Sequence, residues 1–192
     1  QRRQPATFGT TPNLAPKGVV ILANFADTKM NAANTLAVFD ELCNSTNCTV
    51  NKYKNINYPS AAQYFADQSN GTYRPQFDIF GPVTLSKKYA HYGRDLYGYD
   101  EGMDSLAADA VVEACKLANE QFPQLNFADY DTDKDGYVDF VYVIYAGKGQ
   151  ADGGDANTIW PHNWDIYSAS YYGNCTYPKS EWKVDGKTLN TY

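Results

Sequence analysis

The run Gly18–Phe25, Gly-Val-Val-Ile-Leu-Ala-Asn-Phe, constrains the fold more than any other segment of this chain. It is apolar over the length of a strand and does not alternate between apolar and polar positions. Such a run is typical of a strand whose two faces are both buried. The sequence therefore predicts a strand in the middle of the core, with other elements packed on both of its faces.

Three stretches carry helical periodicity. One face of Asn31–Leu42 is apolar, and Pro59-Ser60 opens a second helical pattern that ends before Gly71. The best-defined helix is predicted over Ser105–Phe122, where apolar residues recur at helical spacing until Pro123 stops it.

Extended segments are predicted between and after these helices. Tyr73–Leu85 contains two of them, broken at Gly81-Pro82 into a bent or hairpin pair. Phe140–Ala146 is a further apolar strand. Near the end, Asp185-Gly186 is typical of a tight hairpin turn between the strands Glu181–Val184 and Lys187–Tyr192.

The composition limits the kind of protein. A chain of 192 residues can bury a core as one domain. We assign residues 1–17, with three prolines, to an extended arm and residues 18–192 to the domain. The net charge of −6 and the absence of a basic run argue against nucleic acid as a partner. No apolar stretch approaches the roughly 18 residues of a membrane span, and no apolar signal core follows Gln1, so any secretion signal is expected to be already removed.

The acidic run that precedes the Phe140–Ala146 strand suits a calcium-binding loop. Carboxylates stand at alternate positions before a glycine that permits a sharp turn, and Ca²⁺ prefers several oxygen ligands. The twelfth position, a Glu in an EF-hand, is Tyr142 here, so the loop is not an EF-hand. The alternatives are a solvated acidic turn, or a bound calcium that stabilises the fold without chemistry. The predicted ligands are Asp131, Asp133, Asp135, the carbonyl of Tyr137, and Asp139 directly or through water, with Asp129 the nearest further candidate.

The four cysteines permit three pairings. Cys43 and Cys48 bracket a short polar loop, and their closeness predicts a local disulfide. Cys115 lies in a helical pattern and suits a buried thiol, while the pairing of Cys175 stays open. The many Tyr, Asn, Thr and Ser residues and the calcium loop favour a secreted, extracellular or periplasmic protein.

Several blocks, in order along the chain, resemble the immune-inhibitor-A family of secreted bacterial zinc metalloproteases. The resemblance covers about Gly18 to Tyr192. It implies an α/β (α+β) fold, a zincin-like twisted mixed sheet with packed helices, and hydrolysis of protein or peptide substrates by a metal-activated water. The blocks are Ala62–Ser69 with Gly71, Phe77–Leu85, Asp133–Gly149, and Asp152–Gly154 leading to Ile159–His162.

Members of that family bind zinc through H-E-x-x-H on a helix, and these 192 residues contain no such motif. The two histidines, His91 and His162, are far apart in the sequence. We therefore expect the front part of a catalytic domain without its zinc-binding helix. Zinc and activity are expected only with a downstream part of the same domain. The alternatives are a non-catalytic, calcium-stabilised secreted binding or adhesion domain, and a complete enzyme whose metal site combines both histidines with an Asp.

His162 lies between Trp160 and Trp164. A histidine in this setting suits a metal or proton-transfer role, or a ring fixed by packing and hydrogen bonds beside a cleft. We predict that Trp160 and His162 line a substrate cleft.

Overall fold

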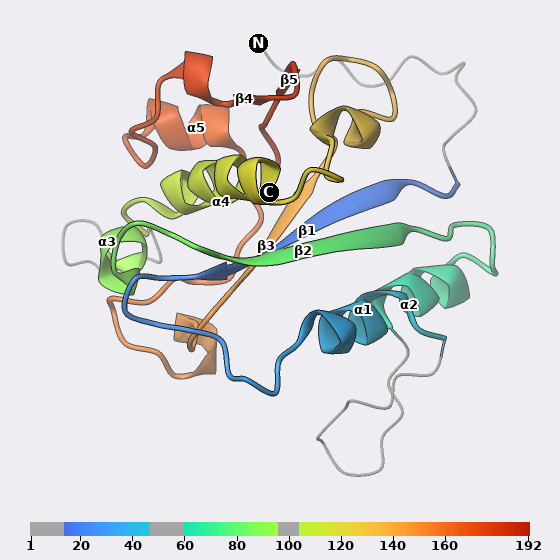
Figure 1. The fold of residues 1–192 in the computed structure, drawn as a ribbon, viewed down its shortest axis with the longest axis horizontal. Coiled ribbons are helices and arrows are strands. Elements are labelled where there is room, and N and C mark those ends of the chain that lie inside the picture. Colours follow the sequence, from blue (N-terminus) through green and yellow to red (C-terminus); the bar gives the residue numbers. More distant parts are fainter. Residues whose placement is uncertain (1–13, 47–59, 96–103) are drawn as a thin grey trace.

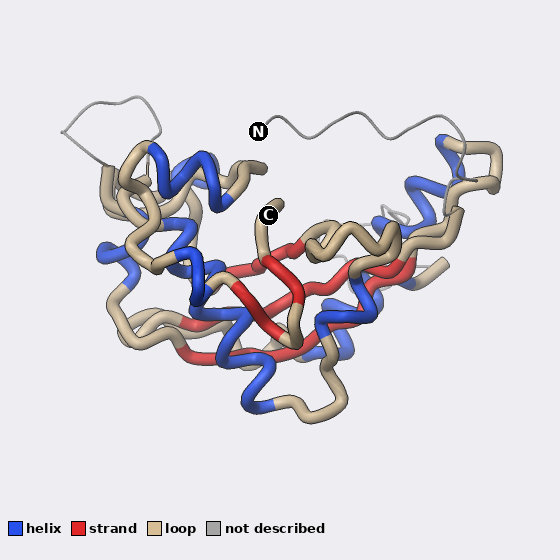
Figure 2. The backbone as a smooth tube through the Cα atoms, turned by 90° about the horizontal axis from the view of Figure 1, so that it is seen from above, coloured by secondary structure: helices blue, strands red, loops and turns tan. Residues whose placement is uncertain are grey.

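The computed structural model describes residues 14–46, 60–95 and 104–192. Its centre is a parallel sheet in the order β2-β1-β3, formed by β1 (Lys17–Asn24), β2 (Gln76–Thr84) and β3 (Val141–Tyr145) (Figure 1). The strand predicted to be buried on both faces is confirmed, because the side chains from Val19 to Ala23 of β1 are buried. Figure 2 shows the strands running through the middle of the molecule with helices around them.

The two faces of β1 contact different layers. Val19, Ile21 and Ala23 belong to the main core, under the long helix α4 (Ala107–Gln121). Val20 and Leu22 belong to a second cluster, packed against residues of α1 (Leu36–Asn44) and α2 (Ala61–Gln68). Because side chains alternate across a strand, one continuous apolar run supplies both layers.

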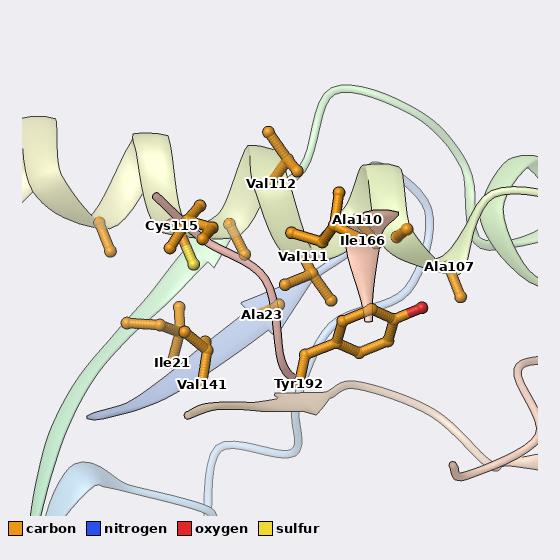
Figure 3. Packing of buried hydrophobic residues seen from close by; sticks show 14 of the residues in the cluster. Ile21, Ala23, Ala107, Ala110, Val111, Val112, Cys115, Val141, Ile166 and Tyr192 are labelled. Carbon is orange, nitrogen blue, oxygen red and sulfur yellow. The ribbon is translucent and has the colours of Figure 1, made fainter. Parts of the chain in front are cut away.

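Close packing of α4 on the sheet depends on small side chains. Figure 3 shows Ala110, Val111 and Cys115 of α4 facing Ile21 and Ala23 of β1. Alanine and cysteine let the helix axis approach the sheet, and α4 confirms the helix predicted over Ser105–Phe122.

The first two predicted helices are present, the first with a later start and the second where Ser60 predicts it. Within Asn31–Leu42 the helix begins only at Leu36, because the Thr35 side chain caps it by accepting a hydrogen bond from Val38 N. The second begins at Ala61, where Ser60 accepts from Gln63 N. The remaining short elements are α3 (Tyr89–Gly93), η2 (Phe127–Tyr130), η3 (Gln150–Asp152), α5 (Ile166–Tyr171) and η4 (Lys179–Glu181).

The segment predicted as a bent or hairpin pair is one strand. β2 pairs in parallel with β1 on both sides of Gly81-Pro82, and a register shift between Ile21 and Ala23 absorbs the irregularity. Gly81 has φ of +116°, and a Cβ there would lie 2.5 Å from the Leu22 carbonyl oxygen. The bend is therefore local to the strand, and the hairpin alternative is wrong because the ladder with β1 continues past the glycine.

The hairpin predicted at Asp185-Gly186 is confirmed. Asp185 and Gly186 have φ of +47° and +76°, and they join β4 (Lys183–Val184) to β5 (Lys187–Thr188). Beyond Thr188 the predicted strand reduces to one isolated bridge, which joins Asp165 to Thr191.

The α/β class is confirmed. Among the described residues the central sheet is entirely parallel, and antiparallel pairing occurs in the separate β4–β5 hairpin. No helix in the described ranges is long and apolar enough to cross a bilayer. Of the predicted Cys43–Cys48 disulfide, Cys48 lies outside the described residues. Within them, Cys43, Cys115 and Cys175 are not bonded to one another, and Cys115 is fully buried.

Candidate functional site

The acidic loop lies between η2 and β3 and turns sharply at its middle. Lys134 and Gly136 have positive φ values of +61° and +91°. The turn is held by its own carboxylates: Asp131 Oδ2 accepts a hydrogen bond from Gly136 N at 3.1 Å, and Asp135 Oδ1 accepts from Tyr137 N at 2.9 Å. The glycine is required for its backbone conformation, since a Cβ there would meet nothing within 4 Å.

Three of the four predicted carboxylates come together. One ligand oxygen from each of Asp131, Asp133 and Asp139 lies within 4.8 Å of the other two. Asp135 is outside this group, where it accepts the hydrogen bond from Tyr137 N. Asp129 is also outside it, and its Oδ1 lies 3.4 Å from Asn126 Nδ2. The structure thus assembles a smaller carboxylate set than the sequence predicts.

Asp131 is the most constrained member of the group. Its side chain has no exposed surface, and its Oδ2 lies 2.7 Å from the Lys187 ammonium. The hydrogen bond from Lys187 holds the pKa of Asp131 below its usual range. Oδ1 is buried and has no hydrogen-bond partner among the described residues. A buried carboxylate oxygen without a partner costs folding free energy, and a bound cation would satisfy it.

Asp139 is fixed by Thr132. Its Oδ2 accepts hydrogen bonds from Thr132 N at 3.1 Å and from the Thr132 hydroxyl. These hydrogen bonds hold the Asp139 carboxylate in position before an ion binds, which reduces the entropy cost of binding.

These donors fit a hard cation and do not fit a catalytic zinc. Ca²⁺ takes oxygen ligands, whereas catalytic zinc is held by three protein ligands that include histidine. In the described ranges, the all-carboxylate group is the one set of three metal-binding side chains. His91 lies outside it with its ring against Tyr92, 5.0 Å between centroids, and His162 lies outside it in a different part of the fold.

A second constellation surrounds the predicted residues Trp160 and His162. The backbone of Trp160 contacts both Asp104 and His162. Its N–H donates to the Asp104 carboxylate at 3.0 and 3.2 Å. Its carbonyl oxygen lies 2.6 Å from His162 Nδ1. The Trp160 side chain is 47% exposed. The backbone of this segment therefore anchors a carboxylate and an imidazole while the indole stays at the surface.

His162 and Asp104 face a cavity of about 270 Å³ beside the start of α4. His162 Nδ1 is 3.7 Å from Asp104 Oδ2, and His162 Nε2 is 3.4 Å from the Tyr192 hydroxyl. Figure 3 shows the Tyr192 ring beside α4 with its hydroxyl directed toward Ala107. Tyr192 also lines the cavity, and the other lining residues are Ala107, Ala108, Asn163, Trp164 and Asn174.

Asp104 was not predicted from the sequence as a site residue. Its side chain is 2% exposed, and burial raises its pKa to about 7 although the hydrogen bond from Trp160 N–H opposes the shift. The partner lies 56 positions away, so no local pattern reveals the contact. A buried carboxylate with a raised pKa, in a cavity beside a histidine, is typical of functional sites.

Gly93 allows α3 to pack closely against the backbone that precedes Trp160. A Cβ on Gly93 would lie 2.6 Å from Ile159 N and 2.7 Å from the Thr158 carbonyl carbon. Such contacts with backbone are too short for any side chain, so this close approach requires glycine.

The chain is similar to known proteins along most of its length. Residues 15–191 match the family described as immune inhibitor A peptidase M6, catalytic domain. Immune inhibitor A of Bacillus thuringiensis subsp. alesti is 32% identical over 119 residues, which are 54% of this chain and 17% of that protein. The pre-pro-metalloprotease PrtV of Vibrio cholerae serotype O1 is 29% identical over 127 residues, which are 57% of this chain and 13% of that protein.

The aligned parts thus span less than a fifth of these relatives' lengths. The family match covers far more of this chain than either pairwise alignment, from just before β1 to Thr191. On this evidence the chain belongs to the immune inhibitor A family of M6 peptidases.

Proposed function

We propose that this chain is part of a zinc-dependent endopeptidase that hydrolyses protein or peptide substrates. Family membership over residues 15–191 is the observation that carries the proposal. When bound, zinc would supply the activated water that attacks a peptide carbonyl. The 192 residues offer two histidines and no H-E-x-x-H, so the zinc ligands are proposed to come from residues outside this sequence.

The part played by the described residues is binding and positioning. We propose that Trp160 and His162 line the substrate site, because an exposed indole stands beside a cavity that contains an imidazole and a buried carboxylate. Aromatic rings beside a few convergent polar groups are typical of ligand sites. The parallel sheet and α4 provide the rigid support behind them.

We also propose that the acidic loop binds one calcium ion through Asp131, Asp133 and Asp139. The buried and unpartnered Oδ1 of Asp131 carries this proposal, since a cation at that position would satisfy it. The Tyr137 carbonyl remains a predicted further ligand. Asp135 shapes the turn through the hydrogen bond that its Oδ1 accepts from Tyr137 N, and it remains a predicted further ligand.

The role of this calcium would be structural. The loop joins η2 to β3, and its Val138 N donates to the Thr188 carbonyl at 3.0 Å. An ion would therefore stabilise a contact between segments that are distant in sequence. It would do so without taking part in the peptidase reaction.

An extracellular location is part of the proposal. A structural calcium site suits compartments rich in calcium, and the predicted Cys43–Cys48 disulfide suits an oxidising one. Mass spectrometry of non-reduced peptides from exported protein tests the pairing. Two free thiols in that material would reject it.

The peptidase proposal is tested by comparing two proteins. One is the 192-residue chain, and the other is the same gene product extended downstream through an H-E-x-x-H motif. We expect only the extended protein to bind zinc and to cleave casein in a manner blocked by 1,10-phenanthroline. The matched control replaces the glutamate of that motif with glutamine, which retains zinc but removes the general base.

Two results would contradict the proposal. Chelator-sensitive cleavage by the 192 residues alone would place the zinc site within them. An extended protein that binds zinc but cleaves no peptide would reject the endopeptidase assignment.

A further inference from the structure

The cavity beside α4 presents hydrogen-bond acceptors. The Asp104 carboxylate lies in its wall and is 2% exposed. Asn174, also in the wall and 2% exposed, donates through Nδ2 to the Asp104 carbonyl at 2.8 Å, so its amide orientation is fixed. Its Oδ1 is buried and has no hydrogen-bond partner among the described residues.

His162 adds a third acceptor. Its Nδ1 lies 2.6 Å from the Trp160 carbonyl oxygen, a contact that requires the proton on Nδ1. In the neutral imidazole Nε2 is then an acceptor, and it faces the Tyr192 hydroxyl at 3.4 Å. Side chains with three different kinds of acceptor, those of Asp104, Asn174 and His162, therefore line one small cavity.

Among the described residues that line the cavity, only His162 can carry a positive charge, and its Nδ1 lies 3.7 Å from Asp104 Oδ2. None of the described residues that line the cavity is Lys or Arg. Two nearby carboxylates add negative potential: Asp95 raises the pKa of Asp104, and Asp165 contributes to the raised pKa of Tyr192. A site that is negative and rich in acceptors is complementary to a positively charged group that carries several N–H donors.

The apolar walls of the cavity favour a ligand with an aliphatic part next to its charged group. Ala107, Ala108, Trp164 and Tyr192 contribute apolar surface, and the alanines leave the space open. The volume of about 270 Å³ is below the range of about 300–1,000 Å³ for sites that take whole drug-sized ligands. It suits one long side chain with an aliphatic stem and a charged end.

We propose that this cavity is a specificity pocket that binds a lysine or arginine side chain of the substrate. The inference rests on the proposed peptidase function and names the substrate residue that the Asp104, Asn174 and His162 acceptors would recognise. The stem would lie along Ala107, Ala108 and Trp164, and the charged end would lie beside Asp104 and Asn174.

The binding test uses the 192-residue chain and needs no peptidase activity. The probes are n-butylguanidinium and n-butylammonium, and the control probe is n-butylurea, which has nearly the shape of n-butylguanidinium without its charge. Binding is followed by two-dimensional NMR through the Trp160 backbone amide and the Trp164 indole. We expect both cations to shift these signals and to bind at least about tenfold more tightly than the urea, as charge-assisted hydrogen bonds require.

Two substitutions locate the site. Asp104→Asn keeps the shape and the acceptor for Trp160 N–H but removes the charge, and it should weaken cation binding at least about tenfold. Ala107→Leu should abolish binding because the larger side chain fills the cavity. This variant tests the pocket if the Asp104→Asn variant does not fold. Glu120→Gln, an equal change of charge on an exposed residue near the other end of α4, should bind like the wild type.

The outcomes separate this inference from the proposed function. Equal binding of n-butylurea, no binding of the cations, or unchanged binding in a folded Ala107→Leu variant would overturn the pocket. Cation binding by the chain, with no peptidase activity in the extended protein, would retain the pocket and reject the endopeptidase. In an active extended protein, replacing lysine by norleucine at the preferred subsite should lower kcat/KM, and an unchanged value would overturn the pocket alone.

Discussion

The Lys187 ammonium lies 2.7 Å from Oδ2 of Asp131, across 56 positions of sequence. The contact joins the β4–β5 hairpin to the acidic loop. Thr188 reinforces it, because its N–H donates to the Gly136 carbonyl at 3.0 Å. One carboxylate thus has a protein cation on one oxygen and no described partner on the other.

Replacing Lys187 should separate its own contribution to stability from that of a calcium ion bound at Asp131. In chelator, Lys187→Met is expected to lower the free energy of unfolding by about 1–3 kcal/mol, because Asp131 loses a charged partner. In saturating calcium the deficit should shrink, and the calcium Kd should tighten because a competing positive charge is gone. Urea unfolding with and without calcium measures both effects.

Lys183→Met is the control for that experiment. Lys183 is exposed on the same hairpin and is expected to leave both quantities unchanged. If the Lys187 variant lost the same stability with calcium as without it, Lys187 and calcium would not share Asp131.

Calcium itself should stabilise the chain. A concentration 100-fold above Kd adds about 2.7 kcal/mol to the free energy of unfolding, which corresponds to a rise in Tm of about 5–10 °C for this size. Asp139→Asn should remove that rise, because it takes a charge from the carboxylate group that Thr132 positions. Differential scanning calorimetry with calcium and with EGTA measures it.

Asp152→Asn provides the comparison, since Asp152 is an exposed carboxylate outside the carboxylate group. It should keep the full calcium-dependent rise in Tm. An equal Tm in calcium and EGTA for the wild-type chain would reject the calcium site.

Asp104 should make the folded chain less stable as pH rises. Its folded pKa, about 7, lies above its ordinary value of 3.8, so the folded state holds this proton more tightly than the unfolded state. The contribution of Asp104 to stability is therefore greatest below pH 4 and is lost as pH rises to about 7, by at most about 4 kcal/mol. Relative to Asp104→Asn, the wild-type chain should lose stability between these values.

Urea unfolding at several pH values, with calcium held constant, tests the sign. Glu120→Gln should retain the wild-type pH dependence, because Glu120 is exposed. A constant difference between wild type and Asp104→Asn across this range would show that the carboxyl group titrates normally.

Cys115 should behave as a core residue without accessible chemistry. It is fully buried on α4, and burial raises the pKa of its thiol. We expect iodoacetamide to label it only after unfolding. Cys115→Ser should cost about 1–3 kcal/mol, more than Cys115→Ala, because a hydroxyl buried among apolar groups lacks a partner. Labelling of Cys115 in the native chain, or a harmless serine, would contradict the observed packing.

The elements that could be predicted from the sequence are those whose signals are local. The apolar run of β1, the helical spacing of α4 and the Asp185-Gly186 turn each depend on neighbouring residues, and each is found in the structure. The carboxylate spacing predicted ligands from Asp131, Asp133, Asp135 and Asp139, and the structure brings Asp131, Asp133 and Asp139 together.

Features that depend on residues far apart in the sequence could not be predicted in this way. Pairing with β1 keeps β2 continuous through Gly81-Pro82, where local chemistry alone predicts a break. The hydrogen bond between Asp104 and Trp160 and the ion pair between Asp131 and Lys187 exist because loops from separate elements meet on one scaffold. Periodicity and turn chemistry report the backbone near each residue, whereas burial and pKa depend on the groups that folding brings beside it.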